Sequence, residues 1–247
     1  MKKKEVAIEN NEETKELHKK KRKFRDFIPL IVIIVSLLLI AVEGVLYYQR
    51  SYLTPFWVNG QSMYPTLNGE ATTPNGQKIG KEGGSATVGS TVDYGVMDEH
   101  QGAIDKLKRF DIVITKYLSN DTDTSKIKRV IGLPGETVEF KNTGRGNKNN
   151  GDLYINGKLV EQPLKSEYVV DGSYQNCKWV LKNNEYIVCG DNRNHSYDSR
   201  NAGVGPITKN KIKGKAIAIC GKAEVYVTDS GKLGVKNIDY FWPRYLK

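Results

Sequence analysis

The feature that most constrains this chain is a long apolar run near its N-terminus. Residues 27–48 read FIPLIVIIVSLLLIAVEGVLYY, and Glu43 is the single charged residue among them. About 20 apolar residues in a helix cross the hydrocarbon core of a bilayer, and Tyr47 and Tyr48 suit the interface at the end of such a span. A buried core helix is the alternative, but an all-round apolar run of this length rarely packs inside a small domain. We therefore predict a transmembrane helix over residues 27–48.

The charges around this run predict its orientation. Residues 19–26, KKKRKFRD, place six Lys and Arg directly before it, whereas only Arg50 lies close behind it. Because basic flanks stay on the cytoplasmic side, residues 1–26 should form a cytoplasmic basic tail and residues 49–247 should lie on the outer face of the cell membrane. A cleaved signal peptide is the other interpretation, with residues 42–44, VEG, as a weak cleavage site. We favour an uncleaved, single-pass anchor because the apolar run is longer than a signal peptide needs.

The composition argues against some classes of partner. The net charge is +10, but the basic residues are interspersed with acids and form no Arg-rich stripe. We therefore expect no nucleic-acid partner. The basic residues would instead attract the protein to anionic membrane lipid. Of the three cysteines, Cys189 and Cys220 lie in apolar runs and should be buried small hydrophobes. The absence of a CxxC or a His/Cys cluster predicts no metal site and no cofactor.

After the apolar run, short segments rich in β-branched residues dominate the sequence. These segments are DIVITKY (111–117), KRVIG (128–132), TVEF (137–140), YIVCG (186–190), KAIAIC (215–220) and EVYVT (224–228). Residues 153–160, LYINGKLV, place Asn-Gly between two alternating halves, which predicts a hairpin. Short strands without a βαβ rhythm predict a mostly β fold, an antiparallel β-rich extracytoplasmic domain over residues 49–247.

Three segments lack this strand pattern. Residues 1–18 are charged and polar, and we expect them to be disordered. Residues 69–105 are rich in Gly, Thr and Asn and are interpreted as a long loop or insertion. Residues 240–246, YFWPRYL, are aromatic and either close the core or touch the membrane.

Three polar motifs interrupt the β pattern. They are NGQSMYPTL (59–67), IKRVIGLPGE (127–136) and GDNRNHSYDSR (190–200). Each one alone is compatible with ordinary turn chemistry, and short motifs are often matched by chance. Together they supply a serine in a turn, a lysine at the start of an apolar strand, and a loop dense in hydrogen-bonding groups. That set could provide a nucleophile, a base and a support.

Together the three motifs resemble those of type I signal peptidases, also called leader peptidases. The hallmark elements of that family look like SMxPTL, KRxxGLPGD and GDNRxxSxDSR, and a further element, GDIVVFKY, is similar to FDIVITKY at 110–117. The layout of the chain is similar to that of the Gram-positive members. The resemblance implies a membrane-bound serine endopeptidase that removes N-terminal signal peptides from exported preproteins after small residues. Its partners would be signal peptides, membrane lipid and the secretion translocon.

The resemblance also assigns roles to individual residues. It implies Ser62 as the nucleophile and Lys128 as the general base, a Ser-Lys dyad. Ser196 would hydrogen-bond the lysine amine, and Asp198 and Arg200 would pair and brace the third motif. The shallow pockets for small substrate residues would be formed by Val58, Gly60 and Ile127, with Phe56 and Trp57 beside them.

A lysine can act as a base near neutral pH only if its pKa falls. The ordinary pKa is about 10.4, and burial among apolar groups lowers it because the ammonium loses its hydration. A pKa of about 8 corresponds to ~3 kcal/mol of unfavourable burial. Alternation along a strand places Ile127 and Arg129 on the face opposite to Lys128, so the desolvating groups should come from other strands.

The sequence departs from the family pattern at two positions near these motifs. Certain family members have a Ser or Thr two residues before the nucleophile, whose hydroxyl helps to stabilise the developing oxyanion, but this chain has Gly60. The second oxyanion donor must then come from elsewhere. Phe110 stands where the family usually has Gly.

Other functional classes remain open at this point. His195 lies in the third motif near Asp198, and a Ser62–His195–Asp198 triad can be imagined, although a base and its orienting group in one short turn seldom aim at a third residue. A membrane-anchored chaperone or assembly factor for exported surface proteins would not need catalysis. A self-cleaving Ser-Lys repressor would need an N-terminal helix-turn-helix in place of the apolar run.

Overall fold

The computed structural model describes residues 2–82, 84–116, 125–142, 151–163 and 177–246. The chain divides into two compact units, Met1–Ser51 and Tyr52–Lys247. The first is a helix and the second a β-rich domain, and each is described by itself.

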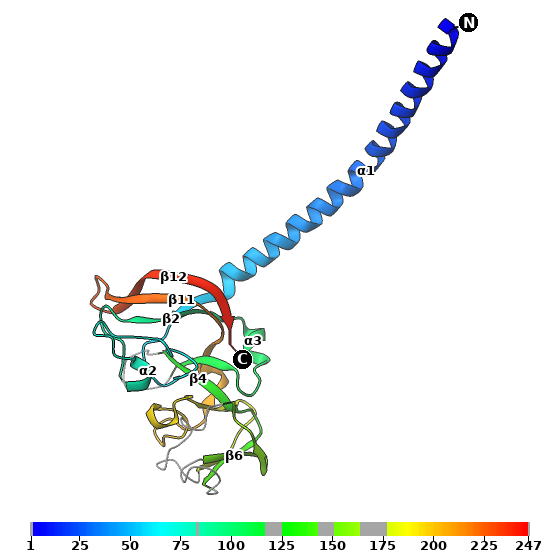
Figure 1. Ribbon diagram of the computed structural model, residues 1–247. Helices are drawn as coiled ribbons and strands as arrows, with labels where there is room; N and C mark the ends of the chain where they lie inside the picture. Colours follow the sequence, from blue (N-terminus) through cyan, green and yellow to red (C-terminus); the bar gives the residue numbers. More distant parts are fainter. Residues whose placement is uncertain (1, 83, 117–124, 143–150, 164–176, 247) are drawn as a thin grey trace. The chain divides into compact units, whose positions relative to one another are not determined.

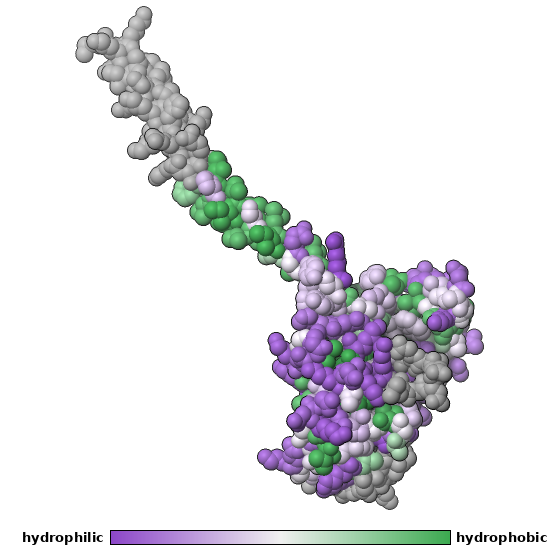
Figure 2. Space-filling model, turned by 180° about the vertical axis from the view of Figure 1, so that it is seen from behind, coloured by the Kyte–Doolittle hydropathy of each residue, from purple (hydrophilic) through white to green (hydrophobic). Residues whose placement is uncertain are grey.

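The first unit is the helix α1, Lys2–Tyr52. Its segment Phe27–Tyr52 is long and apolar enough to cross a membrane, with a mean hydropathy of 2.8, and Figure 2 shows the apolar band on this part of the helix. The helix predicted over 27–48 is confirmed and ends four residues later. The expected disorder of residues 1–18 is wrong, because α1 begins at Lys2. This charged part contains many Glu and Lys, which are good helix formers, and extending an existing helix is easier than starting one.

The second unit contains two antiparallel sheets (Figure 1). The larger sheet runs in the order β1-β2-β11-β3-β4-β9-β10, with β12 paired to β11. Its strands are β1 Leu53–Trp57, β2 Thr91–Asp98, β3 Ile112–Lys116, β4 Ser125–Gly132, β9 Glu185–Cys189, β10 Ile207–Thr208, β11 Ile212–Val227 and β12 Leu233–Tyr245. The smaller sheet, in the order β7-β6-β5-β8, consists of β5 Thr137–Asn142, β6 Gly151–Ile155, β7 Lys158–Val160 and β8 Cys177–Val180. The prediction of a mostly β, antiparallel domain is confirmed.

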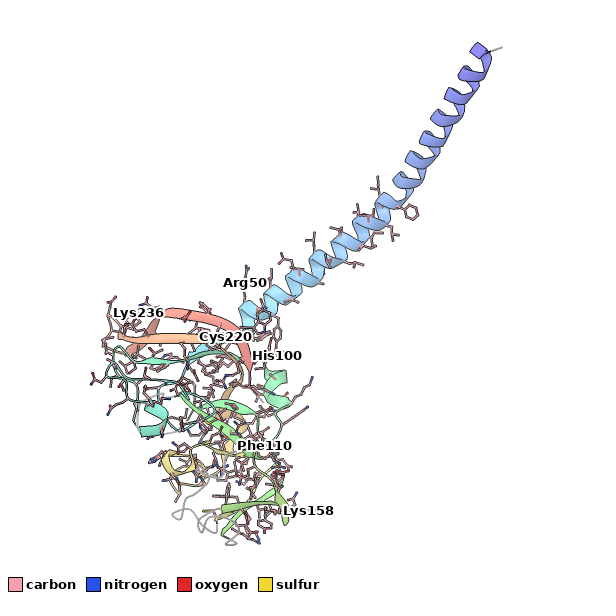
Figure 3. All side chains as sticks on the ribbon, in the orientation of Figure 1. Arg50, His100, Phe110, Lys158, Cys220 and Lys236 are labelled. Atoms are coloured by element: carbon pink, nitrogen blue, oxygen red, sulfur yellow. The ribbon has the colours of Figure 1, made fainter. Side chains whose placement is uncertain are left out.

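The Asn-Gly hairpin is also confirmed. Asn156 and Gly157 have φ values of +51° and +79°, as a type I′ turn requires, and Ile155 pairs with Lys158 across the turn. This hairpin, marked by Lys158, and Lys236 on β12 lie at opposite ends of the unit (Figure 3).

The interpretation of residues 69–105 as a loop is wrong over much of its length. This segment contains α2 (Ile79–Glu82), β2 and α3 (Gln101–Asp105), and β2 pairs with both β1 and β11. The sequence concealed β2 because acidic residues and Gly are disfavoured in strands. Asp93 is nevertheless buried in β2, because its carboxylate accepts hydrogen bonds from Lys222 Nζ and from the backbone N–H of Asn68, both 2.6 Å.

Two further strand predictions need correction. The segments 215–220 and 224–228 were expected as two strands but belong to the single strand β11, which stays continuous through register shifts beside Gly221. The aromatic segment 240–246 forms the end of β12, and Trp242 there is 90% exposed. Of the predicted strand at 111–117, Tyr117 lies outside the described residues.

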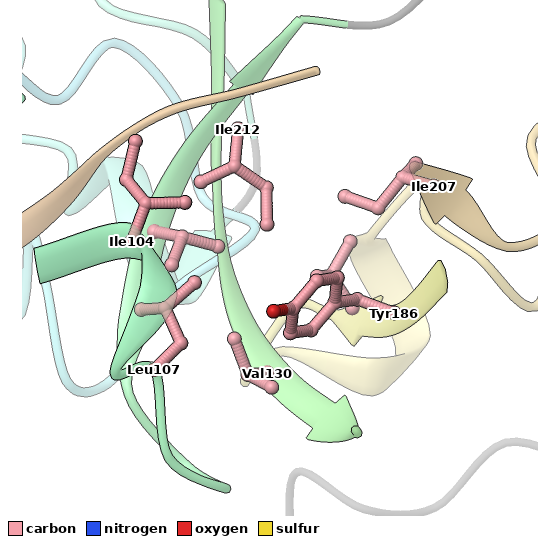
Figure 4. Close-up of a cluster of buried hydrophobic side chains, with 8 residues drawn as sticks. Ile104, Leu107, Val130, Tyr186, Ile207 and Ile212 are labelled. Carbon is pink, nitrogen blue, oxygen red and sulfur yellow. The ribbon is translucent and has the colours of Figure 1, made fainter. Parts of the chain in front are cut away.

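The core consists of several apolar clusters on the faces of the sheets. One cluster lies between α3, β4 and β9 and includes Ile104, Val130 and Tyr186 (Figure 4). A second cluster combines side chains of β2, β3 and β11 with Val58, Met63 and Leu67 from the segment that follows β1. Met63 and Leu67 belong to the first polar motif, so the turn that carries Ser62 is anchored in the core.

The three cysteines are free thiols. Cys189 is fully buried, as predicted, and burial raises the pKa of its thiol to about 12. Cys220 is only half-buried, so its predicted burial is wrong. The apolar residues next to Cys220 in the sequence predicted a buried position, but the face of β11 on which Cys220 lies is partly open to solvent.

Candidate active site

Ser62 lies in a turn that two apolar side chains hold in place. Tyr64 N–H donates to Gln61 O (2.9 Å), and Leu67 N–H donates to Met63 O (2.9 Å). Met63 and Leu67 are fully buried, whereas Ser62 is half-buried. The turn therefore presents the Ser62 hydroxyl at the surface of the core instead of inside it.

Lys128 on β4 lies directly against this hydroxyl. Its Nζ is 2.8 Å from Ser62 Oγ and donates to Ile127 O at 2.9 Å. The residue is only 2% exposed, and fully buried Val113 stands opposite it on β3. Burial lowers the pKa of Lys128 to about 8, although the nearby carboxylate of Asp198 acts in the opposite direction. The direction is the one that the sequence analysis requires of a lysine base.

The third motif is folded against the backbone of Ser62. Asn192 N–H donates to Ser62 O (3.0 Å). Gly190 lies so close that a Cβ at this position would be 2.3 Å from Ser62 O and 2.3 Å from Ser196 Oγ. Only glycine fits there without moving the backbone of Ser62, which is a packing requirement that the sequence alone does not reveal.

Asp198 and Arg200 pair inside the same loop. Arg200 Nε and Nη2 donate to the two carboxylate oxygens of Asp198 at 2.9 and 3.0 Å, and Arg200 Nη2 also donates to Arg193 O (2.9 Å). Gly190 N–H donates to Asp198 Oδ2 at 2.9 Å. Burial alone would raise the pKa of the Asp198 carboxyl, but Arg200 outweighs it and holds that pKa below its ordinary value. This pair links the loop to Gly190, and through Gly190 to the nucleophile.

Ser196 is buried at the same place, but the bond expected from the resemblance is not formed. Its Oγ is buried and makes no close hydrogen bond among the described residues, but it lies near enough to the Asp198 carboxylate to help lower the pKa of that group. Lys128 Nζ donates instead to Ser62 and to the Ile127 carbonyl. The position of Ser196 beside Gly190 leaves its hydroxyl available to the active site.

A second buried ion pair, which the sequence reasoning missed, joins all three motifs. Arg129 donates to both carboxylate oxygens of Asp191, at 2.7 and 2.6 Å, and to Phe110 O at 2.7 Å. Thr66 Oγ1 donates to the same carboxylate at 2.5 Å. Arg129 is thus engaged by Asp191 and Phe110, whereas its neighbour Lys128 contacts Ser62. Arg129, Asp191 and Thr66 each stand in one of the three quoted motifs. Their presence there is the sequence signal that could have indicated this ion pair.

The three residues predicted to bind substrate differ in exposure. Val58 is 2% exposed and belongs to the second cluster, so it can form only the floor of a pocket. Gly60 and Ile127 are half-buried, and so are Phe56 and Trp57. A Cβ at Gly60 would meet no atom within 4 Å, so the Ser or Thr of other family members would fit at this position.

Phe110 departs from the family pattern at a position where the backbone favours glycine. Its φ is +73°, a conformation that costs a side chain of this size free energy. Its N–H donates to Val130 O (2.7 Å), and its carbonyl accepts from Arg129. These bonds hold the backbone in place, and the ring packs against the cluster around Ile131.

His195 is not placed to act as the base. It is exposed at the end of a short 3₁₀ helix, Arg193–His195. Both carboxylate oxygens of Asp198, the partner that a triad would need, are engaged by Arg200. Among the described residues no group of three His, Cys, Asp or Glu could hold a metal ion.

A serine hydroxyl beside a buried lysine of lowered pKa, on an antiparallel β scaffold, is an arrangement compatible with a serine hydrolase. The family model described as signal peptidase, peptidase S26, matches residues 26–220. The chain is 36% identical over 187 residues to signal peptidase I S of Bacillus subtilis, covering 72% of this chain and 82% of that protein. It is 35% identical over 189 residues to signal peptidase I of Bacillus amyloliquefaciens, covering 72% and 78%.

A crystal structure of a signal peptidase I from Enterococcus faecalis is 28% identical, with a TM-score of 0.33, and the match covers 44% of this chain and 96% of that one. The family match and the Bacillus relatives together show that the chain belongs to the signal peptidase family, peptidase S26. It is a serine peptidase that removes signal peptides, and its apolar N-terminal helix is consistent with a membrane-anchored enzyme.

Proposed function

We propose that the reaction runs through Ser62 and Lys128 as a Ser-Lys dyad and cuts exported preproteins after small residues. The observation that supports this most directly is the 2.8 Å separation of Lys128 Nζ and Ser62 Oγ at a buried site. At this separation the neutral amine can accept the hydroxyl proton while Oγ attacks the scissile carbonyl. With a pKa of about 8, an appreciable fraction of Lys128 is neutral at slightly alkaline pH.

The proton then passes on to the departing amine, and an acyl group remains on Ser62. Lys128 would next take a proton from a water molecule, whose oxygen attacks the ester and releases the cleaved chain. The carbonyl of Ile127 accepts a hydrogen bond from Nζ, which fixes the direction of the amine in both halves of the cycle. Ser196 Oγ, buried in the same region beside the Asp198 carboxylate, would provide a further polar contact for the amine.

The developing oxyanion needs hydrogen-bond donors. The backbone N–H of Ser62 donates to none of the described residues, so it can point at the oxyanion. A side-chain donor at position 60 is lacking because that residue is Gly60. The second donor in this chain would therefore be a water molecule or another backbone N–H.

The substrate would bind as an extended chain along β4. Val130 exchanges hydrogen bonds with Phe110 and Asp111 next to β3, and alternation directs the N–H and C=O of Ile127 to the other edge. On that edge β9 pairs with β4 only from Arg129 onward. The edge at Ile127, beside Lys128, can thus accept a peptide by strand addition. Half-buried Gly60 and Ile127 and the buried floor at Val58 would limit the pockets to small side chains.

The test of the dyad is a comparison of the wild-type enzyme and Ser62→Ala, each incubated with a preprotein in detergent. We expect Ser62→Ala to lose all processing while it keeps the circular dichroism spectrum of the wild type, because the hydroxyl is half-buried and makes no bond that the fold requires. Processing at the wild-type rate would eliminate Ser62 as nucleophile. It would then leave a chaperone or assembly factor as the better explanation.

We also propose that the β-rich unit faces outward, close to membrane lipid, with the basic segment 1–26 in the cytoplasm. Protease added to intact protoplasts should digest residues 53–247 and spare an epitope tag at the N-terminus, because the basic flank at 19–26 keeps that end inside. Protection of the β-rich unit with digestion of the tag would reverse the orientation.

A further inference from the structure

The strand that leads to the nucleophile has one edge turned away from β2. Val58 N–H donates to Asp93 O on β2, and Asn68 Nδ2 donates both to Val58 O (2.7 Å) and to Gly60 O (3.2 Å). Because successive residues of an extended strand direct their carbonyls to alternate sides, the carbonyl of Asn59 points to the opposite edge. Asn59 stands three residues before Ser62.

This edge forms one side of the space that an extended substrate needs. Ser62 Oγ lies 2.8 Å from Lys128 Nζ, and Ile127 packs against the cluster that contains Val58, so the residues before Ser62 lie near β4 at Ile127. A peptide whose scissile carbonyl reaches Ser62 would lie between these two backbones. It would gain hydrogen bonds from Asn59 on one side as well as from Ile127 on the other.

The edge at Asn59 is already occupied by the chain itself. Ala86 N–H donates to Asn59 O (2.7 Å) and also lies 3.0 Å from Asn59 Oδ1. Ser85 forms an antiparallel bridge with Gly60. The segment 84–86 is therefore paired as a short strand with the residues directly before the nucleophile.

This pairing is only lightly supported. The segment begins at Gly84, whose φ is +123°, and Gly89, whose φ is +81°, follows three residues after Ala86. Both conformations are ones that glycine adopts readily. Between them only Ala86 is buried, against a cluster that includes Ile79 and Val92. A segment with so few buried contacts opens at low free-energy cost.

We propose that residues 84–86 are an internal gate strand, which occupies the backbone edge at Asn59 and is displaced when a preprotein binds. The inference rests on the proposed binding of the substrate as an extended strand beside Ser62. The side chain of Ala86 packs against Ile79 and Val92, so the segment competes with the substrate through its backbone. The gate strand occupies the hydrogen-bonding edge at Asn59 and is exchanged there for the substrate strand.

Replacement of the Ala86 N–H tests this gate in the full-length enzyme. Ala86→Pro removes the donor to Asn59 and should raise kcat/KM for a preprotein about fivefold, which corresponds to the ~1 kcal/mol of one hydrogen bond. Ala86→Ser keeps the N–H and should stay within about twofold of the wild type. Ser85→Pro stiffens the neighbouring position, where alternation turns the N–H away from Asn59, and should also stay near the wild-type value. An unchanged or lower kcat/KM in folded Ala86→Pro would show that the segment is a fixed wall.

A second measurement does not depend on the folding of Ala86→Pro. Amide hydrogen exchange of residues 84–88 is followed in Ser62→Ala, which binds but should not cleave, with and without a preprotein. Displacement predicts faster exchange in the complex. Slower or unchanged exchange contradicts the gate and leaves the dyad untouched, because the dyad is tested separately by the loss of cleavage in Ser62→Ala.

Discussion

Lys128→Arg is expected to abolish signal-peptide cleavage, with a loss of about 10³-fold or more in kcat/KM, in line with the loss of a general base. The guanidinium keeps the positive charge and much of the length of the side chain but does not deprotonate in proteins. Lys128→Met should be equally inactive. The wild-type kcat/KM should rise with pH around a midpoint near 8, where burial has placed the pKa of Lys128, and level off above it.

The matched control is His195→Ala, because His195 is exposed and both oxygens of Asp198 are engaged elsewhere. It should keep most of the activity. A histidine base would give a midpoint near 6.5, so the pH profile separates the two residues. Full activity in folded Lys128→Arg, together with an inactive His195→Ala, would refute the dyad.

Buried Lys128 should also lower the free energy of unfolding of the protein at low pH. Its pKa is lower in the folded than in the unfolded chain, so below pH 8 folding must bury an ammonium. Lys128→Met removes this penalty of about 3 kcal/mol. The free energy of unfolding of Lys128→Met should therefore exceed that of the wild type at pH 6 to 7. The difference should shrink as the pH rises from 8 towards 10.5, because the folded amine is then neutral and folding costs only the release of the proton that the unfolded chain still holds, a cost that falls as the pH rises.

Asp198→Asn should destabilise the enzyme by about 3 to 5 kcal/mol, because it leaves Arg200 buried without its carboxylate. Arg200 is 4% exposed on its side chain and Asp198 0%. Denaturant unfolding of the detergent-solubilised protein measures the loss. Since the folded pKa of Asp198 lies below the ordinary 3.8, the stabilisation is present above that pH and disappears as the pH falls through the folded pKa.

A double variant separates the unpaired charge from other effects. Asp198→Asn combined with Arg200→Gln leaves no unpaired charge at positions 198 and 200 and should be less destabilised than Asp198→Asn alone. The residual activity of Asp198→Asn carries a further signature. Its carboxylate raises the pKa of Lys128, so its removal should move the midpoint of the pH profile below that of the wild type. A variant as stable as the wild type, with an unchanged midpoint, would contradict the bracing role of Asp198.

Features that depend on contiguous residues could be predicted from the sequence. The apolar run at 27–48 predicts a helix because its composition alone makes it long and apolar enough to span a bilayer. The Asn-Gly pair at 156–157 predicts a type I′ hairpin because these residues tolerate positive φ at little cost. The motifs around Ser62 and Lys128 were found because each is a short local pattern, and their resemblance to a family supplied the roles.

The sequence was misleading where a distant residue changes what a local pattern means. Asp93 made β2 look like a loop, because the sequence does not show that Lys222 and Asn68 hold its carboxylate. Residues 215–228 looked like two strands because Gly221 interrupts the β-branched pattern. The strand β11 nevertheless continues through Gly221, because its pairing with β2 and β12 accommodates register shifts there.

By itself, the sequence determined the apolar helix and the antiparallel β character of the rest, because both follow from side-chain chemistry within a few neighbouring positions, and its local motifs supplied the candidate reacting groups through their resemblance to a family. Only the tertiary structure decided what those groups can do. Ser62 and Lys128 are 66 positions apart and come to 2.8 Å, and the pKa of Lys128 falls because other strands exclude water from its amine. The pairing of Ala86 with Asn59 likewise exists only after folding, because hydrogen bonds and burial depend on distances in space and not on distance along the chain.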